Sequence, residues 1–106
     1  MEFISGIREK EVLGIQEVIS GDYEGRTVRM NGTVHTIRHM GEVAFVILRK
    51  AEGLVQCVCE GASGHLDLKE LKEECAAEVK GTVRKEERAP HGFEIRVEDI
   101  KILSRP

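Results

Sequence analysis

The stretch GEVAFVILRKAEGLVQCV, residues 41–58, contains two apolar runs that flank a short charged turn. Each run alternates in a way that suits a β-strand with two different faces. Two such runs joined by a few residues that include glycine predict a β-hairpin. We therefore expect strands over residues 43–50 and 54–60, connected through residues 51–53.

The register of this hairpin decides which side chains share a face, since successive side chains of a strand point to opposite sides. We expect Arg49 to lie opposite Leu54. One face is then small and apolar throughout, as a barrel interior requires, and consists of Ala44, Val46, Leu48, Val55, Cys57 and Cys59. The other face carries an aromatic ring beside a side-chain amide, and we expect it to be the outer face: Phe45, Ile47, Leu54, Gln56 and Val58.

The remainder of the chain predicts a mainly β domain. Alternation continues along residues 27–38, where Gly32 suggests a bend or bulge. The other expected elements are strands over 76–86 and 93–103 and helices over 8–19 and 66–75. Three strands, a helix and two strands make the order of the OB-fold, a five-stranded Greek-key barrel. Such barrels bind oligonucleotides or oligosaccharides on the face centred on strands two and three.

Composition describes an ordinary soluble globular chain, with 41% hydrophobic and 33% charged residues. We expect a cytoplasmic protein, because the chain has neither a signal peptide nor an apolar run of the roughly 18 residues that span a membrane. Three cysteines without a C-x-x-C pair and four scattered histidines argue against a disulfide framework and a metal site. No arrangement of nucleophile and base indicates catalysis. One domain is expected, with an N-terminal extension over 1–21, a barrel over 22–104 and a linker starting at 105–106.

Charge is distributed unevenly, although a net charge of −3 does not by itself indicate a nucleic-acid binder. Residues 26–50 hold five cations and one acid, whereas residues 51–79 hold seven acids and two cations. Such asymmetry suits an anionic partner that approaches one side of the domain. Two solvated faces explain the same distribution equally well.

An outward Phe45 beside Gln56, near Arg38 and Arg49, is an arrangement that suits base recognition. The ring can stack on an unpaired base, and the amide offers a donor and an acceptor to the edge of that base. In the alternative, Phe45 packs under the N-terminal helix and Gln56 is merely solvated. The residues alone leave both interpretations open.

Two groups of residues make the chain resemble the anticodon-binding domain of archaeal-type class II aspartyl-tRNA synthetases. The first follows G-x-V-x-x-x-R-x-x-G, F-x-x-L-R and G-x-x-Q, at Gly32, Val34, Arg38, Gly41, Phe45, Leu48, Arg49, Gly53 and Gln56. The second follows G-x-V…P-x-G-x-E-[IV], at Gly81, Val83, Pro90, Gly92 and Glu94. The resemblance covers about residues 22 to 104. Asparaginyl- and lysyl-tRNA synthetases share the domain.

The resemblance implies that Phe45 and Gln56 contact the central uracil of an anticodon and that Arg38 contacts the anticodon loop. Arg49 is expected to join this RNA-binding set, with pairing to an acid across the barrel as its rival role. The implied partner is the tRNA for aspartate, or also that for asparagine, and no membrane is expected.

The resemblance also bears on the third anticodon base, which is cytosine for aspartate and uracil for asparagine. Many archaeal-type enzymes have Trp directly after the first-strand glycine, where this chain has Thr33. Forms that charge both tRNAs tend to lack that Trp and to carry a His in this strand and a Pro in the last loop, as at His35 and Pro90. A relaxed third-base requirement is therefore expected.

In the family, a catalytic domain that uses ATP and Mg²⁺ follows the OB-fold, and its motifs do not occur in these 106 residues. The resemblance implies a parent aspartate–tRNA ligase, usually a homodimer. The domain alone is expected to bind RNA, with no cofactor and no catalysis. Two alternatives are a free-standing OB-fold protein that binds nucleic acid and a barrel that binds other proteins.

Overall fold

The computed structural model describes residues 14–19, 23–60 and 71–105. The predicted mainly β fold is confirmed. Its elements are α2 (Ile15–Ile19), β1 (Thr27–Met40), β2 (Val43–Lys50), β3 (Gly53–Glu60), β4 (Ala76–Lys85), the 3₁₀ turn η2 (Pro90–Gly92) and β5 (Phe93–Ser104). The expected boundary between an N-terminal extension and the barrel falls next to residues outside this description, so that division stays a prediction.

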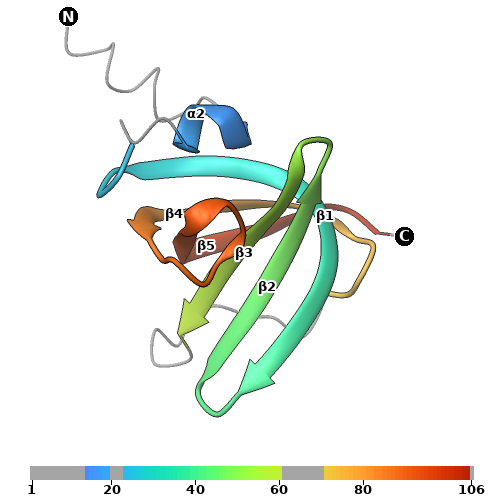
Figure 1. Cartoon of the computed structure of the whole chain (residues 1–106). Coiled ribbons are helices and arrows are strands. Elements are labelled where there is room, and N and C mark those ends of the chain that lie inside the picture. Colours follow the sequence, from blue (N-terminus) through green and yellow to red (C-terminus); the bar gives the residue numbers. More distant parts are fainter. Residues whose placement is uncertain (1–13, 20–22, 61–70, 106) are drawn as a thin grey trace, which may run out of the picture.

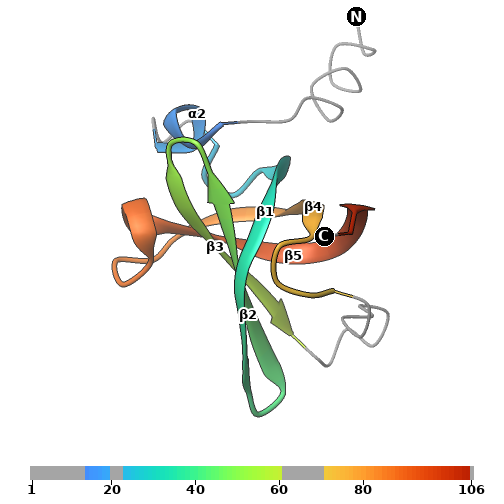
Figure 2. The same ribbon diagram turned by 90° about the vertical axis from the view of Figure 1, so that its right-hand side faces the viewer.

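The five strands close into a barrel in the order β1-β2-β3-β5-β4 (Figure 1). All neighbouring strands are antiparallel except β3 and β5, which are parallel. Figures 1 and 2 both show the β1–β2 hairpin projecting away from β4 and β5. This order is the Greek-key arrangement of the OB-fold, and it leaves the outer sides of β1, β2 and β3 next to one another.

β1 serves two sides of the barrel, and its bulge does not lie at Gly32, where a bend or bulge was expected. It pairs with β4 over 27–33 and with β2 over 33–40. The register with β2 shifts around His35, not at Gly32. Gly32 instead allows a close approach, because a Cβ there would lie 2.9 Å from the backbone oxygen of Arg49.

The predicted register of the β2–β3 hairpin is confirmed. Arg49 pairs with Leu54, and the next outward pairs are Ile47 with Gln56 and Phe45 with Val58. The outward side chains are partly exposed. The inward side chains are all buried in the barrel core: Ala44, Val46, Leu48, Val55, Cys57 and Cys59. The alternation of the sequence therefore identified both faces correctly.

The helix expected over 66–75 is wrong in its described part. Residues 71–75 contain a turn, and Glu74 has φ 72, which no α-helix contains. The backbone N–H of Glu74 donates to the oxygen of Val34 (2.7 Å), and the oxygen of Cys75 accepts from the N–H of Val34 (2.8 Å). Pairing with β1 thus replaces the hydrogen bonds that a last helical turn would make. Residues 66–70 lie outside the described part of the chain.

The helix expected over 8–19 is present in its described C-terminal part, as α2. Ile15 and Val18 are buried against the barrel core, whereas Ile19 is 43% exposed. Residues 8–13 are outside the description. Within the described ranges, no helix is long and apolar enough to cross a membrane. The same ranges contain no group of three or more His, Cys, Asp or Glu residues placed to hold a metal ion.

Candidate nucleic-acid interface

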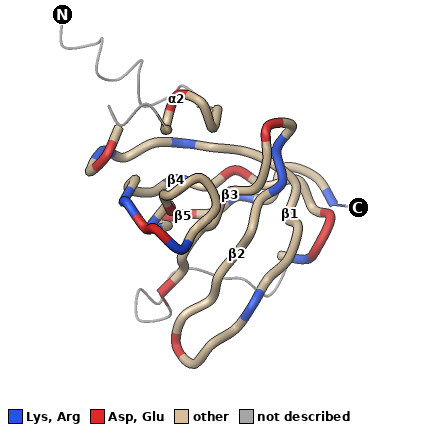
Figure 3. Tube along the Cα trace, viewed as in Figure 1, with Lys and Arg blue, Asp and Glu red and all other residues tan. Residues whose placement is uncertain are grey.

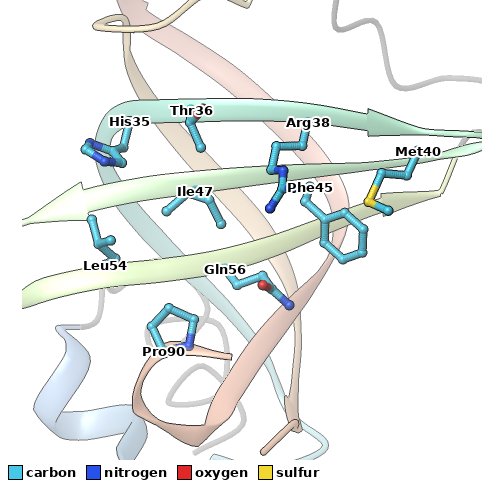
Figure 4. A pocket seen from close by; sticks show the side chains of 9 residues that line it. All are labelled: His35, Thr36, Arg38, Met40, Phe45, Ile47, Leu54, Gln56 and Pro90. Carbon is cyan, nitrogen blue, oxygen red and sulfur yellow. The ribbon is translucent and has the colours of Figure 1, made fainter. Parts of the chain in front are cut away.

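A hollow of about 360 Å³ lies on the outer side of β1, β2 and β3 and is bounded at one side by η2 (Figure 4). Three neighbouring strands supply its floor, because alternate side chains of each strand point outward there. The lining residues are His35, Thr36, Arg38, Met40, Phe45, Ile47, Leu54, Gln56 and Pro90. The structure therefore brings together five of the seven residues that the sequence indicated.

Phe45 and Gln56 both line this hollow, as their shared face predicted. Phe45 projects from β2 near the end that Met40 of β1 reaches, and Gln56 projects from β3 (Figure 4). Both side chains are partly exposed. No described residue of α2 lines the hollow that Phe45 lines, so the described part of the helix gives no support to the alternative in which the ring packs beneath it. Residues 8–13 of that expected helix lie outside the described part of the chain. An exposed ring face beside an amide can stack a flat ligand and hydrogen-bond to its edge.

The amide of Gln56 is oriented by a neighbour on β5. Its Nε2 donates to Oε1 of Glu94 at 3.0 Å, and β3 and β5 pair in register at these two residues. Because a carboxylate only accepts, the amide NH₂ must face Glu94. The amide oxygen and one N–H then remain available to a ligand in the hollow.

Among the residues that the structure describes, Arg38 is the one charged side chain that lines the hollow. Figure 3 shows that β2 and β3 carry charged residues only near their ends. None of the salt bridges between described residues involves Arg38. The described lining of the hollow thus combines apolar and uncharged polar side chains with the exposed guanidinium of Arg38.

Arg49 does not line the hollow and is paired with an acid. Its Nη2 donates to Oε1 of Glu74 at 2.9 Å, and its Nη1 to Oε2 at 3.3 Å. This pairing raises the pKa of Arg49 and lowers the pKa of Glu74, mainly through the hydrogen bonds between them. The basic segment 26–50 and the acidic segment 51–79 therefore meet at this ion pair.

Arg49 also determines the tautomer of His35. Nη1 of Arg49 lies 3.3 Å from Nδ1 of His35. A guanidinium has no acceptor, so Nδ1 must accept and the ring proton lies on Nε2. His35 stands at the β1 bulge, which turns this exposed ring toward the hollow.

Thr33 lies outside the hollow, at the junction where β1 changes partners. It pairs with Arg49 on one side and with Ala76 on the other. Pro90 lines the hollow from η2, as its predicted role requires. Sequence reasoning did not single out Met40 or Thr36 as lining residues. Their spacing with Arg38, two residues apart along one strand face, was the available signal.

Fold and site together define a protein class. The family of OB-fold nucleic acid binding domains matches residues 28–103. The chain belongs to this family.

Curated relatives are aminoacyl-tRNA ligases. The aspartate–tRNA(Asp/Asn) ligase of Deinococcus radiodurans is 40% identical over 82 residues, which are 77% of this chain and 18% of that protein. The asparagine–tRNA ligase of Pelotomaculum thermopropionicum is 39% identical over 87 residues, 78% of this chain and 20% of that protein. The chain spans about a fifth of the length of these relatives.

Solved structures of the same class are also similar. The asparaginyl-tRNA synthetase from Pyrococcus horikoshii, complexed with asparaginyl-adenylate, matches with a TM-score of 0.77 and 29% identity. The match covers 92% of this chain and 23% of that one. The similar sequences and the similar structure are thus parts of tRNA ligases.

Proposed function

We propose that this chain is the anticodon-recognition domain of an aspartate–tRNA ligase that accepts the tRNAs for both aspartate and asparagine. The observation that carries the proposal is the hollow in which Phe45, Gln56 and the cation of Arg38 lie together on the outer face of β1, β2 and β3. Single-stranded bases bind by stacking on aromatic rings, while cations hold the backbone. The relatives named as aspartate–tRNA(Asp/Asn) ligases support this choice of tRNA.

Three of the lining residues then have distinct roles in RNA binding. Phe45 stacks the central uracil, and the amide oxygen and free N–H of Gln56 meet its edge, held in place by Glu94. Arg38, at the rim, neutralises a phosphate of the anticodon loop. These roles use the geometry of the hollow and require no metal ion or cofactor.

The third base lies, in this proposal, toward the end of the hollow formed by His35, Leu54 and Pro90. Pro90 has no backbone donor, and the proton on Nε2 of His35 makes that ring nitrogen a donor. Cytosine and uracil share one ring carbonyl, so a donor that meets it accepts either base. Relaxed third-base recognition is the expected result.

The remaining parts of the activity belong to a larger protein. We propose that the parent ligase uses ATP and Mg²⁺ in a separate catalytic domain, forms a homodimer and acts in the cytoplasm. An asparagine–tRNA ligase is the second candidate, because a relative of that name is 39% identical. A free-standing OB-fold protein would bind the same RNA. The codons that follow Pro106 distinguish a domain of a larger ligase from such a free-standing protein.

Titration of the 106-residue chain with anticodon stem-loops tests the proposal. Stem-loops with cytosine or uracil as third base should differ in affinity by less than about tenfold, roughly 1.4 kcal/mol. A change of the central uracil should weaken binding of both. A stronger preference for cytosine indicates a strict aspartate enzyme, and one for uracil indicates the asparagine enzyme. Indifference to the central base contradicts the proposed function.

A further inference from the structure

The ring of His91 in η2 is in close contact with the β2–β3 hairpin at Gly53. The imidazole of His91 rests on the Cα of Gly53, because a Cβ at Gly53 would lie 2.6 Å from Nε2 and 3.2 Å from Cε1 of His91. Real Cβ atoms almost never approach another heavy atom within 3.0 Å. A side chain at position 53 would therefore displace the ring. η2 and β3 are accordingly in contact.

The backbone of η2 is held in a form that its own residues do not favour. His91 has φ 63, in the left-handed region that residues with a Cβ seldom adopt. Such a conformation persists only where the surroundings determine it. Here the N–H of Glu86 donates to the oxygen of Gly92, and that of Gly92 to the oxygen of Ala89, each at 3.0 Å. Ala89 is buried, so the turn is a closed and anchored unit.

Pro90 directly precedes His91 and forms the edge of the hollow beside Leu54 and Gln56 of β3 (Figure 4). Its ring offers no hydrogen bond, so this wall acts on a ligand through shape alone. Because Pro90 and His91 are neighbours in the same closed turn, the contact of the His91 ring with Gly53 constrains the position of Pro90, together with the hydrogen bonds of the turn and buried Ala89. The width of the hollow at this end therefore depends on a contact that lies outside it.

We propose that the Gly53–His91 contact holds Pro90 where the hollow admits a pyrimidine as third anticodon base and excludes a purine. This inference rests on the proposed function, since it takes the ligand to be an anticodon. An apolar wall cannot tell the amine of cytosine from the carbonyl of uracil, but it does limit the size of the base. His91 and Gly53 are positioning residues, and neither touches the RNA.

The experiment uses stem-loops that differ only in the third base, which is cytosine, uracil, adenine or guanine. The wild-type chain should bind stem-loops with a pyrimidine third base about tenfold or more tightly than those with a purine, because an apolar pocket discriminates by size at about this level. His91→Gly removes the ring and tolerates the left-handed backbone, so Pro90 shifts and the preference falls toward equality. His91→Asn, which also tolerates this backbone, should behave in the same way because it lacks the ring.

Gly53→Ala tests the contact from its other side. Its Cβ displaces the ring, so it should lower the pyrimidine preference as His91→Gly does. In the double variant, Gly53→Ala should lower it no further, since the ring that it displaces is already absent. If Gly53→Ala fails to fold because of its φ of 146, the two His91 variants still decide the question. The preference for a central uracil serves as an internal control and should not change.

Two results overturn the inference alone: purines that bind the wild-type chain as tightly as pyrimidines do, or a folded His91→Gly variant with an unchanged pyrimidine preference. In both cases binding still depends on Phe45. Binding that is indifferent to Phe45→Ala overturns the proposed function, and this inference with it.

Discussion

Among single residues, Phe45 carries the greatest expected share of RNA affinity. Its ring is partly exposed on the outer face of β2, whereas the inner face of the same strand is buried in the barrel core. Stacking of a base on an aromatic ring contributes about 1–3 kcal/mol, so Phe45→Ala should weaken stem-loop binding by that amount in a calorimetric titration. Leu103→Ala is the control, because Leu103 is 47% exposed and does not line the hollow. Equal losses in both variants would contradict a stacking role.

Gln56 and Glu94 should act as a unit in recognising the central base. Gln56→Ala should reduce the affinity ratio between stem-loops with central uracil and central cytosine. Glu94→Ala should reduce the same ratio, because the amide loses its hydrogen bond at 3.0 Å and can present either end to the base. Glu98→Ala removes an equal charge from β5 outside the hollow. A ratio that survives Glu94→Ala would show that Glu94 does not orient the amide.

At the scale of elements, the cations of β1 and β2 differ in what surrounds them. Arg38 of β1 lines the hollow, so a phosphate is its expected partner. Arg38→Ala should reduce the slope of log affinity against log salt by about 0.7, the value per phosphate for a single strand. Affinities measured over a series of salt concentrations give this slope. An unchanged slope would remove Arg38 from the phosphate contacts.

Arg49 joins β2 to the segment before β4 through Glu74. Arg49→Ala leaves the carboxylate of Glu74 near the RNA, so it should weaken binding, and Arg49→Ala/Glu74→Ala should restore most of the loss. A double variant as weak as the single one would instead indicate that Arg49 binds phosphate directly. Because Arg49 lowers the pKa of Glu74, the stabilisation from this pair is complete above about pH 4.3. It is lost as the pH falls through the lowered pKa.

Elements also show where sequence patterns stop being informative. The apolar residues of 66–75 have helical spacing, yet Leu71 and Cys75 are buried without a helix. Their spacing reflects burial, which a turn that pairs with β1 satisfies equally well. A bend or bulge was expected at Gly32, whereas the register shift lies at His35. The reason is related, since a glycine signals a close approach of backbones as readily as a bulge.

For the whole molecule, burial of Cys57 and Cys59 makes stability fall at alkaline pH. Burial raises the pKa of Cys59 to about 11 and raises that of Cys57 as well. An unfolded thiol has a pKa of about 8.5. Their protonated forms therefore stabilise the fold fully below that value, and the stabilisation is lost as the pH rises toward the folded pKa values. Urea midpoints should fall between pH 8 and pH 10, and less so in Cys59→Ala. A midpoint that falls equally in both chains would assign the effect to other groups.

By itself, the sequence determined the period of the strands, the register of the β2–β3 hairpin and the shared face of Phe45 and Gln56, because alternation and turn residues act between near neighbours. Only the tertiary structure decided which partners complete the site. Glu74 lies 25 residues from Arg49, and Glu94 lies 38 residues from Gln56. His91, which contacts Gly53, is also 38 residues away from it in the sequence, as Glu94 is from Gln56. Closure of the barrel brings β5 beside β3 and η2 onto the hairpin, and no local pattern specifies contacts over such separations.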